Sequence, residues 1–202
     1  MIRKQKKKKI IGITGSFGSG KTSVAKYFSS YGAKIIDADK IVHSLLNPGT
    51  KVYRQIKHIF GSGVFTRSQR IDRKKIAAIV FEDRKCLKKL NQIIHPQVIR
   101  LIKNEIRLSK ARVVILDVPL LIESGLGRIV DKIIVVKITR KQQLKRIKKK
   151  FSLSEADILK RIKMQLPLSR KVRMADFVID NSGTFKETRK QAGKLRRLLW
   201  KN

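Results

Sequence analysis

The segment that most constrains the fold of this chain is residues 15–22, which read GSFGSGKT. An apolar run at residues 10–13 precedes it, and a helix-forming stretch follows it. The segment is a complete GxxxxGK[ST] phosphate-loop pattern. Backbone N–H groups can wrap a polyphosphate closely only where the loop lacks bulky side chains and has permissive dihedral angles, which its glycines supply. The pattern therefore predicts a strand, an anion-binding loop and a helix in succession.

Each part of this loop has an expected role. Lys21 is expected to reach the β and γ phosphates of ATP, and the Thr22 hydroxyl to ligate Mg²⁺. The following helix would point its N-terminal N–H groups at the anion. A chance glycine-rich turn is the alternative, and a strand before the loop with a helix after it would exclude that reading. The predicted nucleotide-binding residues of this region are Gly15, Ser16, Phe17, Gly18, Ser19, Gly20, Lys21, Thr22 and Ser23.

Length and charge restrict the class of protein. A chain of 202 residues is long enough for one α/β domain with insertions. Its 50 Lys and Arg against 14 Asp and Glu give a formal charge of +36, which would ordinarily suggest a nucleic-acid or anionic-surface partner. The basic residues are spread along the whole chain, however, so we interpret them as a solvated surface and expect no specific nucleic-acid partner.

The surroundings of the protein can also be predicted. Cys86 is the single cysteine, so no internal disulfide can form, which favours a reducing compartment. The basic start of the chain is followed by only four apolar residues before the phosphate loop, too few for a signal peptide. No apolar run approaches 18 residues, so no membrane span is expected. We predict a cytoplasmic protein without a membrane partner, monomeric or weakly homo-oligomeric.

Carboxylates follow the second predicted strand, at residues 33–36, where Asp37-Ala38-Asp39 begins. Ligands bind at the carboxyl ends of strands in open α/β sheets. An aspartate there could orient Mg²⁺ or take a proton from an acceptor hydroxyl, or it could cap a helix that starts near Lys40. The spacing alone does not choose between Asp37 and Asp39.

Residues 40–110 show helical periodicity and no clear strand, which indicates several helices inserted between the second and third strands. His95-Pro96 is expected at a helix start, where the imidazole could meet a substrate phosphate or be structural. Residues 112–117 form a buried parallel strand that ends at Asp117, an arrangement similar to Walker B. Asp117 could hold the metal through water or be a turn residue before Pro119, and Glu123 is a second metal candidate.

The last third of the chain predicts two more strands, at residues 132–138 and 177–180, and a closing helix at 185–200. Between them, residues 143–173 are rich in Lys and Arg. A helix capped by Ser154 and stopped at Pro167 would place Arg161 and Gln165 on one face. This segment is interpreted as a lid over nucleotide phosphates, with an RNA-binding helix as the rival. Five strands alternating with helices predict a doubly wound, five-stranded parallel sheet.

The absence of several motifs excludes other classes of phosphate-loop protein. The chain has neither the NKxD motif of a GTPase nor the LSGGQ-like signature of a transport ATPase, and it is too short for a two-domain helicase. A small kinase that moves the γ-phosphoryl group of ATP to an acceptor remains. Two alternatives are kept: a different small-molecule or nucleotide kinase on this scaffold, and a nucleic-acid-binding ATPase suggested by the charge.

Five sequence blocks resemble the dephospho-coenzyme A kinase family, over residues 10–194: TGSFGSGKTSVA, IIDADKIVH, LNQIIHP, DVPLLIESGL and RIKMQLPLSRKVRMADFVIDNSG. The resemblance implies Mg²⁺-dependent transfer from ATP to the ribose 3′-hydroxyl of dephospho-coenzyme A. It implies that Asp39 is the general base and that Asn181 contacts adenine. Arg146, in the lid, is expected to be a catalytic residue together with Lys21. Thr22 and Asp117 are the expected metal ligands. The expected substrate-binding residues are Asp37, Asp39, His95, Pro119, Leu120, Arg161 and Gln165.

The implied domain organisation has five parts. Residues 1–40, 111–140 and 177–202 form the nucleotide-binding core, residues 41–110 the helical acceptor domain and residues 141–176 the helical lid. The chain departs from the family pattern at two places. Lys150-Phe151 replaces the usual Arg-Asp, which would weaken lid closure because lysine is a point charge. Ser16-Phe17 replaces the usual Gly-Ile, and phosphate binding is expected to survive that change.

Overall fold

The structure is a computed structural model that describes residues 8–150 and 154–200. It forms two compact units. The first holds the described residues up to Ile36 together with those from Ser109 onward, and the second is Asp37–Leu108. Among the described residues, no helix combines the length and the apolar character that crossing a membrane would require.

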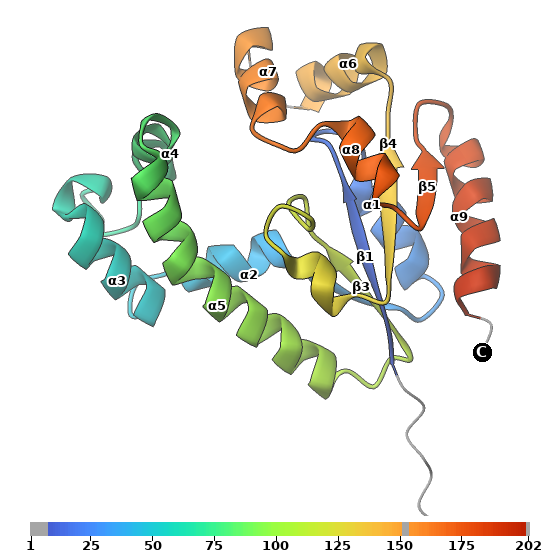
Figure 1. The fold of residues 1–202 in the computed structure, drawn as a ribbon, viewed down its shortest axis with the longest axis horizontal. Coiled ribbons are helices and arrows are strands. Elements are labelled where there is room, and N and C mark those ends of the chain that lie inside the picture. Colours follow the sequence, from blue (N-terminus) through green and yellow to red (C-terminus); the bar gives the residue numbers. More distant parts are fainter. Residues whose placement is uncertain (1–7, 151–153, 201–202) are drawn as a thin grey trace, which may run out of the picture. The chain divides into compact units, whose positions relative to one another are not determined.

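A five-stranded parallel sheet forms the centre of the first unit, with strand order β2-β3-β1-β4-β5 (Figure 1). Because β1 pairs in parallel with both β3 and β4, the carboxyl ends of these strands lie at one edge, where the phosphate loop begins. The predicted α/β fold with a five-stranded parallel sheet is confirmed. The strands are β1 (Lys9–Gly15), β2 (Lys34–Asp37), β3 (Val113–Asp117), β4 (Lys132–Lys137) and β5 (Phe177–Asp180).

The core of this unit is built on the alternation of side chains along β1. Ile11 and Ile13 point into an apolar cluster that also contains residues of α1 (Lys21–Ser29) and α9 (Phe185–Leu199). Gly12 faces the other side, where an added Cβ would lie 2.4 Å from the Leu121 side chain. Both faces of the central strand are therefore covered, which explains its continuous apolar sequence.

Residues 154–173, the second part of the basic segment, contain two helices where the sequence predicted one helix ending at Pro167. α7 (Glu155–Lys163) starts at its Ser154 cap, as predicted, but ends before Gln165. Pro167 then caps α8 (Leu168–Arg173). The proline disfavours helical geometry at the residue before it, which favours a break in the helix at this point. Gln165 therefore lies outside the helix that carries Arg161. The remaining helices of this unit are η2 (Leu126–Ile129) and α6 (Arg140–Lys150).

The second unit is helical, and α2, α3 and α4 contact its longest helix, α5. His95-Pro96 lies in the middle of α5, so the prediction of a helix start there was wrong. A proline inside a helix removes one backbone donor, and here the helix continues past it. The elements are α2 (Ala38–Leu45), α3 (Lys51–Phe60), η1 (Ser62–Val64), α4 (Arg73–Glu82) and α5 (Arg84–Leu108).

Candidate functional site

The loop between β1 and α1 requires glycine at particular positions. Gly18 and Gly20 adopt φ angles of 74° and 89°, which non-glycine residues rarely tolerate. Gly20 is also sterically constrained, because an added Cβ would lie 2.2 Å from Asn181 Nδ2. Neighbouring side chains therefore restrict the backbone conformation of the loop directly before the first turn of α1.

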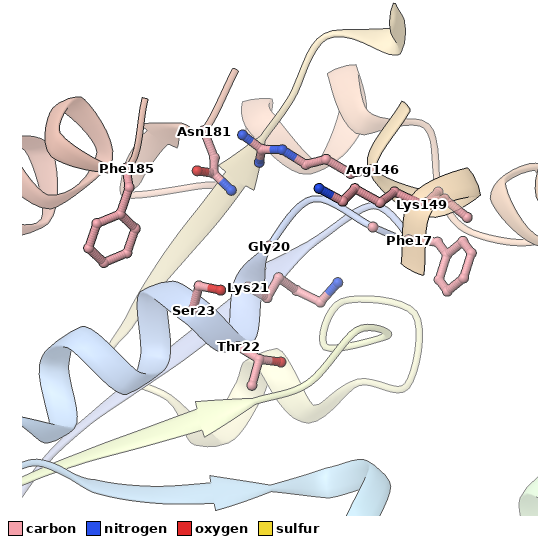
Figure 2. Close-up of a pocket in the computed structure, with 11 residues that line it drawn as sticks. Phe17, Gly20, Lys21, Thr22, Ser23, Arg146, Lys149, Asn181 and Phe185 are labelled. Atoms are coloured by element: carbon pink, nitrogen blue, oxygen red, sulfur yellow. The ribbon is translucent and has the colours of Figure 1, made fainter. Parts of the chain in front are cut away.

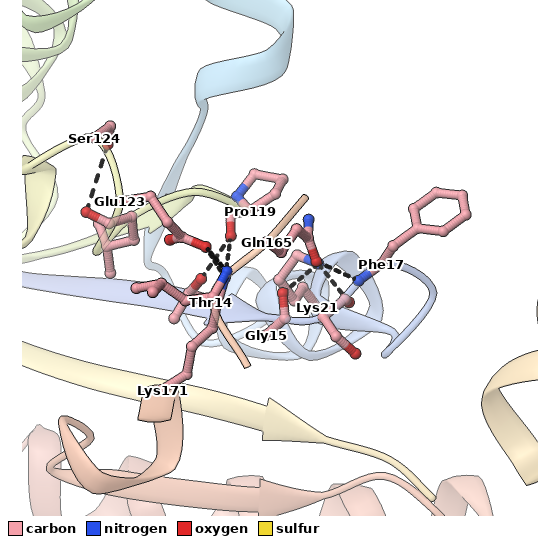
Figure 3. Close-up of polar contacts among 12 residues, drawn as sticks. Thr14, Gly15, Phe17, Lys21, Pro119, Glu123, Ser124, Gln165 and Lys171 are labelled. Carbon is pink, nitrogen blue, oxygen red and sulfur yellow. Dashed lines mark hydrogen bonds and ion pairs between the residues drawn. The ribbon is translucent and has the colours of Figure 1, made fainter. Parts of the chain in front are cut away.

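Lys21 is the first residue of α1 and is only 8% exposed. Its ammonium group donates hydrogen bonds to Gly15 O at 3.3 Å and Ser16 O at 3.1 Å (Figure 3). A buried charge is stable only when its donors are satisfied, and carbonyl groups of the loop meet that need. The side chain therefore folds back over the loop, where it can neutralise phosphate oxygens.

A cavity of about 640 Å³ opens beside this loop (Figure 2). Lys21, Arg146 and Lys149 contribute positive charge to it, which favours an anionic ligand. Of the predicted nucleotide-binding residues, Gly15, Ser16 and Ser19 are buried and do not line the cavity. The lining residues are Phe17, Gly18, Gly20, Lys21, Thr22, Ser23, Arg146, Ile147, Lys149, Asn181 and Phe185.

Asn181 lines the cavity, but its side chain has structural partners. Its Nδ2 donates to Ser19 O at 2.7 Å, and its Oδ1 accepts from the Thr188 hydroxyl at 2.8 Å. With 7% of its surface exposed, Asn181 braces the phosphate loop from the end of β5. Sequence reasoning missed Phe185, which is 67% exposed beside the same cavity. An aromatic residue four positions after Asn181, at a helix start, was the available signal.

Thr22 and Asp117 meet at the carboxyl edge of the sheet. The Thr22 hydroxyl donates to Asp117 Oδ2 at 2.9 Å, and Asp117 is 5% exposed at the end of β3. A hydroxyl and a carboxylate are hard oxygen ligands of the kind that Mg²⁺ prefers, so this pair fits the predicted metal. Elsewhere, the described residues hold no cluster of three His, Cys, Asp or Glu side chains suited to a metal ion.

Glu123, the second metal candidate, has a different partner. Its Oε1 lies 2.7 Å from Lys171 Nζ. Lys171 also donates to Pro119 O at 2.8 Å, and the Thr14 hydroxyl donates to the same carbonyl at 3.0 Å (Figure 3). Pro119 therefore contributes its carbonyl to a structural network. Leu120, the neighbouring residue also predicted to bind substrate, has a side chain that is 43% exposed to solvent.

The predicted lid residues lie close to the phosphate loop. Arg146 donates to Gly183 O at 3.3 Å and lines the cavity. Arg161 and Gln165, predicted to bind the acceptor, both contact Phe17. Of the Lys150-Phe151 departure, Phe151 lies outside the described residues.

The second unit carries the remaining predicted residues. Asp37 caps α2, accepting a hydrogen bond from Lys40 N at 3.1 Å, and Asp39 lies in the first turn of that helix. His95 borders a cavity of about 540 Å³ together with Arg84 and Lys88. Burial lowers the pKa of the His95 imidazole below its ordinary value of 6.5, so the ring is neutral at pH 7 and offers a hydrogen bond rather than a charge.

The parallel sheet, the phosphate loop and the folded-back Lys21 define the class as a phosphate-loop kinase fold. The family model for dephospho-CoA kinase matches residues 9–187, and the chain belongs to that family. It is 41% identical over 185 residues to the dephospho-CoA kinase of Carboxydothermus hydrogenoformans, covering 90% of each chain.

Solved structures agree with this assignment. A Thermus thermophilus protein superposes with a TM-score of 0.89 at 30% identity, covering 98% of this chain and 100% of its own. The dephospho-CoA kinase of Campylobacter jejuni gives 0.67 at 28% identity, covering 93% and 95%. The predicted family is therefore confirmed.

Proposed function

We propose that the protein transfers the γ-phosphoryl group of ATP to the ribose 3′-hydroxyl of dephospho-coenzyme A. The observation that carries the proposal is the cavity in which Lys21, Thr22 and the glycine loop converge, in a chain that belongs to the dephospho-CoA kinase family. Kinases of this fold do little covalent chemistry themselves, so positioning and charge neutralisation account for most of the rate.

The residues of the loop would act on the phosphates. Lys21 neutralises charge on the β and γ oxygens, and Arg146 and Lys149 add positive charge from α6. Thr22 and Asp117 would hold Mg²⁺, which when bound neutralises charge on the transferring group. The N–H groups at the start of α1 point toward the same anion.

Asp39 is the proposed general base, which orients the ribose hydroxyl and takes its proton. Its position in the first turn of α2, directly after β2, supports this role, and the resemblance of the IIDADKIVH block favours it over Asp37. Asp37 already accepts the Lys40 N–H as a helix cap. We further propose that residues 41–110 form the acceptor domain, with His95 and Leu120 among the acceptor contacts, and that residues 141–176 form the lid.

The test offers purified protein ATP together with dephospho-coenzyme A, adenosine, nucleoside monophosphates or shikimate. We expect transfer to dephospho-coenzyme A alone. Asp39→Asn should lower kcat by roughly 10² with little change in ATP affinity, and Lys21→Ala should cost more. Asp37→Asn is the matched comparison, because asparagine still caps the helix. A loss in Asp37→Asn as large as that in Asp39→Asn would refute the assignment of the base.

The remaining proposals concern partners and location. We propose a cytoplasmic enzyme, monomeric or weakly homo-oligomeric, with no specific nucleic-acid partner. Sedimentation velocity at several concentrations tests the oligomeric state. Salt titration of nucleic-acid binding tests the basic surface: affinity that falls steeply with salt reflects charge alone, whereas sequence-specific binding at physiological salt would contradict the proposal.

A further inference from the structure

Phe17, in the phosphate loop, is held by three side chains from distant parts of the chain. Gln165 Oε1 accepts a hydrogen bond from the Phe17 N–H at 2.8 Å (Figure 3). Gln143 Nε2 donates to Phe17 O at 2.5 Å. The guanidinium carbon of Arg161 lies 5.6 Å from the centre of the Phe17 ring, within cation–π range. We call Gln143, Arg161 and Gln165 the Phe17 clamp.

The clamp uses the side chains of two neighbouring loop residues, Ser16 and Phe17. Gln143 is 4% exposed, and its Nε2 also donates to Ser16 Oγ at 2.8 Å. Ser16 supplies the hydroxyl and Phe17 the ring and the backbone groups that the clamp uses. Glycine would offer no hydroxyl to Gln143, and isoleucine no ring to Arg161. Both side chains therefore add contacts between this loop and the basic segment.

The clamp connects two helices and the segment after α7 to one residue. Gln143 belongs to α6, Arg161 to α7, and Gln165 to the segment just after α7. α6 also packs closely on the loop, because a Cβ added to Gly18 would lie 2.4 Å from the Ile147 side chain. Movement of α6 away from the loop must break the contact at the Phe17 C=O, and movement of the segment after α7 must break the contact at the Phe17 N–H. The position of the basic segment and the shape of the loop are thus linked through one residue.

We infer that Gln165 is a positioning residue for phosphoryl transfer, which acts through Phe17 to couple the seating of the lid to the shape of the phosphate loop. The inference rests on the proposed function for its kinetic consequences. ATP can still contact Lys21 and the loop N–H groups when Gln165 is lost, so ATP affinity should change little. The clamp holds the basic segment against the phosphate loop, and this position places its cations beside the phosphates and excludes water. Loss of Gln165 should therefore lower the rate of phosphoryl transfer.

The test compares Gln165→Met, which keeps the length of the side chain but has no strong acceptor, with the neighbouring control Met164→Leu. Met164 is 49% exposed. In Gln165→Met we expect amide exchange at Phe17, measured by NMR in the absence of ligands, to become about tenfold faster. We also expect kcat to fall about tenfold, ATP dissociation constants to stay within about threefold, and the ratio of ATP hydrolysis to transfer to rise. Met164→Leu should match the wild type in all four measurements.

Two further variants separate the contact from general damage. Gln165→Glu keeps an oxygen acceptor, so it should retain the protection of the Phe17 amide. Ser16→Gly with Phe17→Ile should loosen the clamp and give a higher ratio of hydrolysis to transfer. Unchanged amide exchange in Gln165→Met would overturn the inference, and so would faster exchange with an unchanged kcat. If the wild type did not phosphorylate dephospho-coenzyme A, the proposed function would fail separately, and the ATP hydrolysis rate would then test the coupling.

Discussion

Lys171 Nζ and Glu123 Oε1 lie 2.7 Å apart, and the lysine side chain has no exposed surface. The pair joins α8 to the chain segment that follows β3. Additional hydrogen bonds support it: Lys171 donates to Pro119 O at 2.8 Å, and Leu166 N donates to Glu123 Oε1 at 3.0 Å. Burying two charges costs desolvation free energy, and such bonds are what make the pair tolerable. The contact therefore fixes the base of the basic segment beside the sheet.

Removing one member of this pair should destabilise the fold. Lys171→Met leaves the Glu123 carboxylate largely buried without its cation, and Glu123 Oε2 already has no hydrogen-bond partner in the described structure. We expect the free energy of unfolding, measured by denaturant titration, to fall by about 3–5 kcal/mol. The double variant Lys171→Met with Glu123→Gln should lose less, because no unpaired charge remains. Equal losses in the single and double variants would show that the charge is not the cause.

The Thr22–Asp117 pair should control the response to Mg²⁺. Asp117→Asn removes the carboxylate that accepts the Thr22 hydroxyl at 2.9 Å. We expect the Mg²⁺ concentration for half-maximal activity to rise about 10- to 100-fold, as for other residues that orient metal ligands. Thr22→Ser is the control because it keeps the hydroxyl, and it should stay near the wild type. An unchanged Mg²⁺ response in Asp117→Asn would remove this carboxylate from the metal site.

Gly20 and Gly32 form a matched pair for testing the phosphate loop. Both have positive φ angles, of 89° and 83°, but an added Cβ at Gly32 meets nothing within 4 Å. Gly32→Ala should therefore cost only backbone strain, about 1 kcal/mol of stability, and leave ATP binding unchanged. Gly20→Ala must also displace Asn181, which holds Ser19 O, so ATP affinity should fall at least about tenfold. Isothermal titration with ATP distinguishes the two, and equal affinities would contradict the steric argument.

Asp176 should make stability depend on pH in the acid range. Its hydrogen bond with Lys132, at 2.6 Å, lowers the pKa of the carboxyl below its ordinary value of 3.8, with Ile133 N as a further donor. The unfolded chain then binds the proton more readily than the folded one, so the contribution is present above pH 3.8 and is lost as the pH falls below it.

We expect Asp176→Asn to lower the free energy of unfolding at pH 7 by about 0.5–1 kcal/mol, since the pair is partly exposed to solvent. The difference from the wild type should shrink as the pH falls below 3.8. Denaturant titrations at pH 7 and at acid pH measure this, and a difference that stays constant over that range would contradict the assignment.

Local patterns predicted the elements that carry the site. The loop between β1 and α1, the strand that ends at Asp117 and the last strand before Asn181 all follow from short apolar runs and their punctuation. The misplaced features depend on longer range. The sequence suggested a helix start at His95 and a single helix through Gln165, but tertiary packing and one proline decided both positions.

By itself, the sequence determined the family, the parallel sheet and the glycine loop with Lys21, because each is recognised from short motifs and apolar runs whose residues are adjacent in the chain. Only the tertiary structure decided what the side chains do. It turned Asn181 into a brace for the loop, paired Glu123 with Lys171, and brought Arg161 and Gln165 onto Phe17. Such partners are up to 162 positions apart along the chain, and residue spacing cannot report contacts that arise when distant segments pack around one sheet.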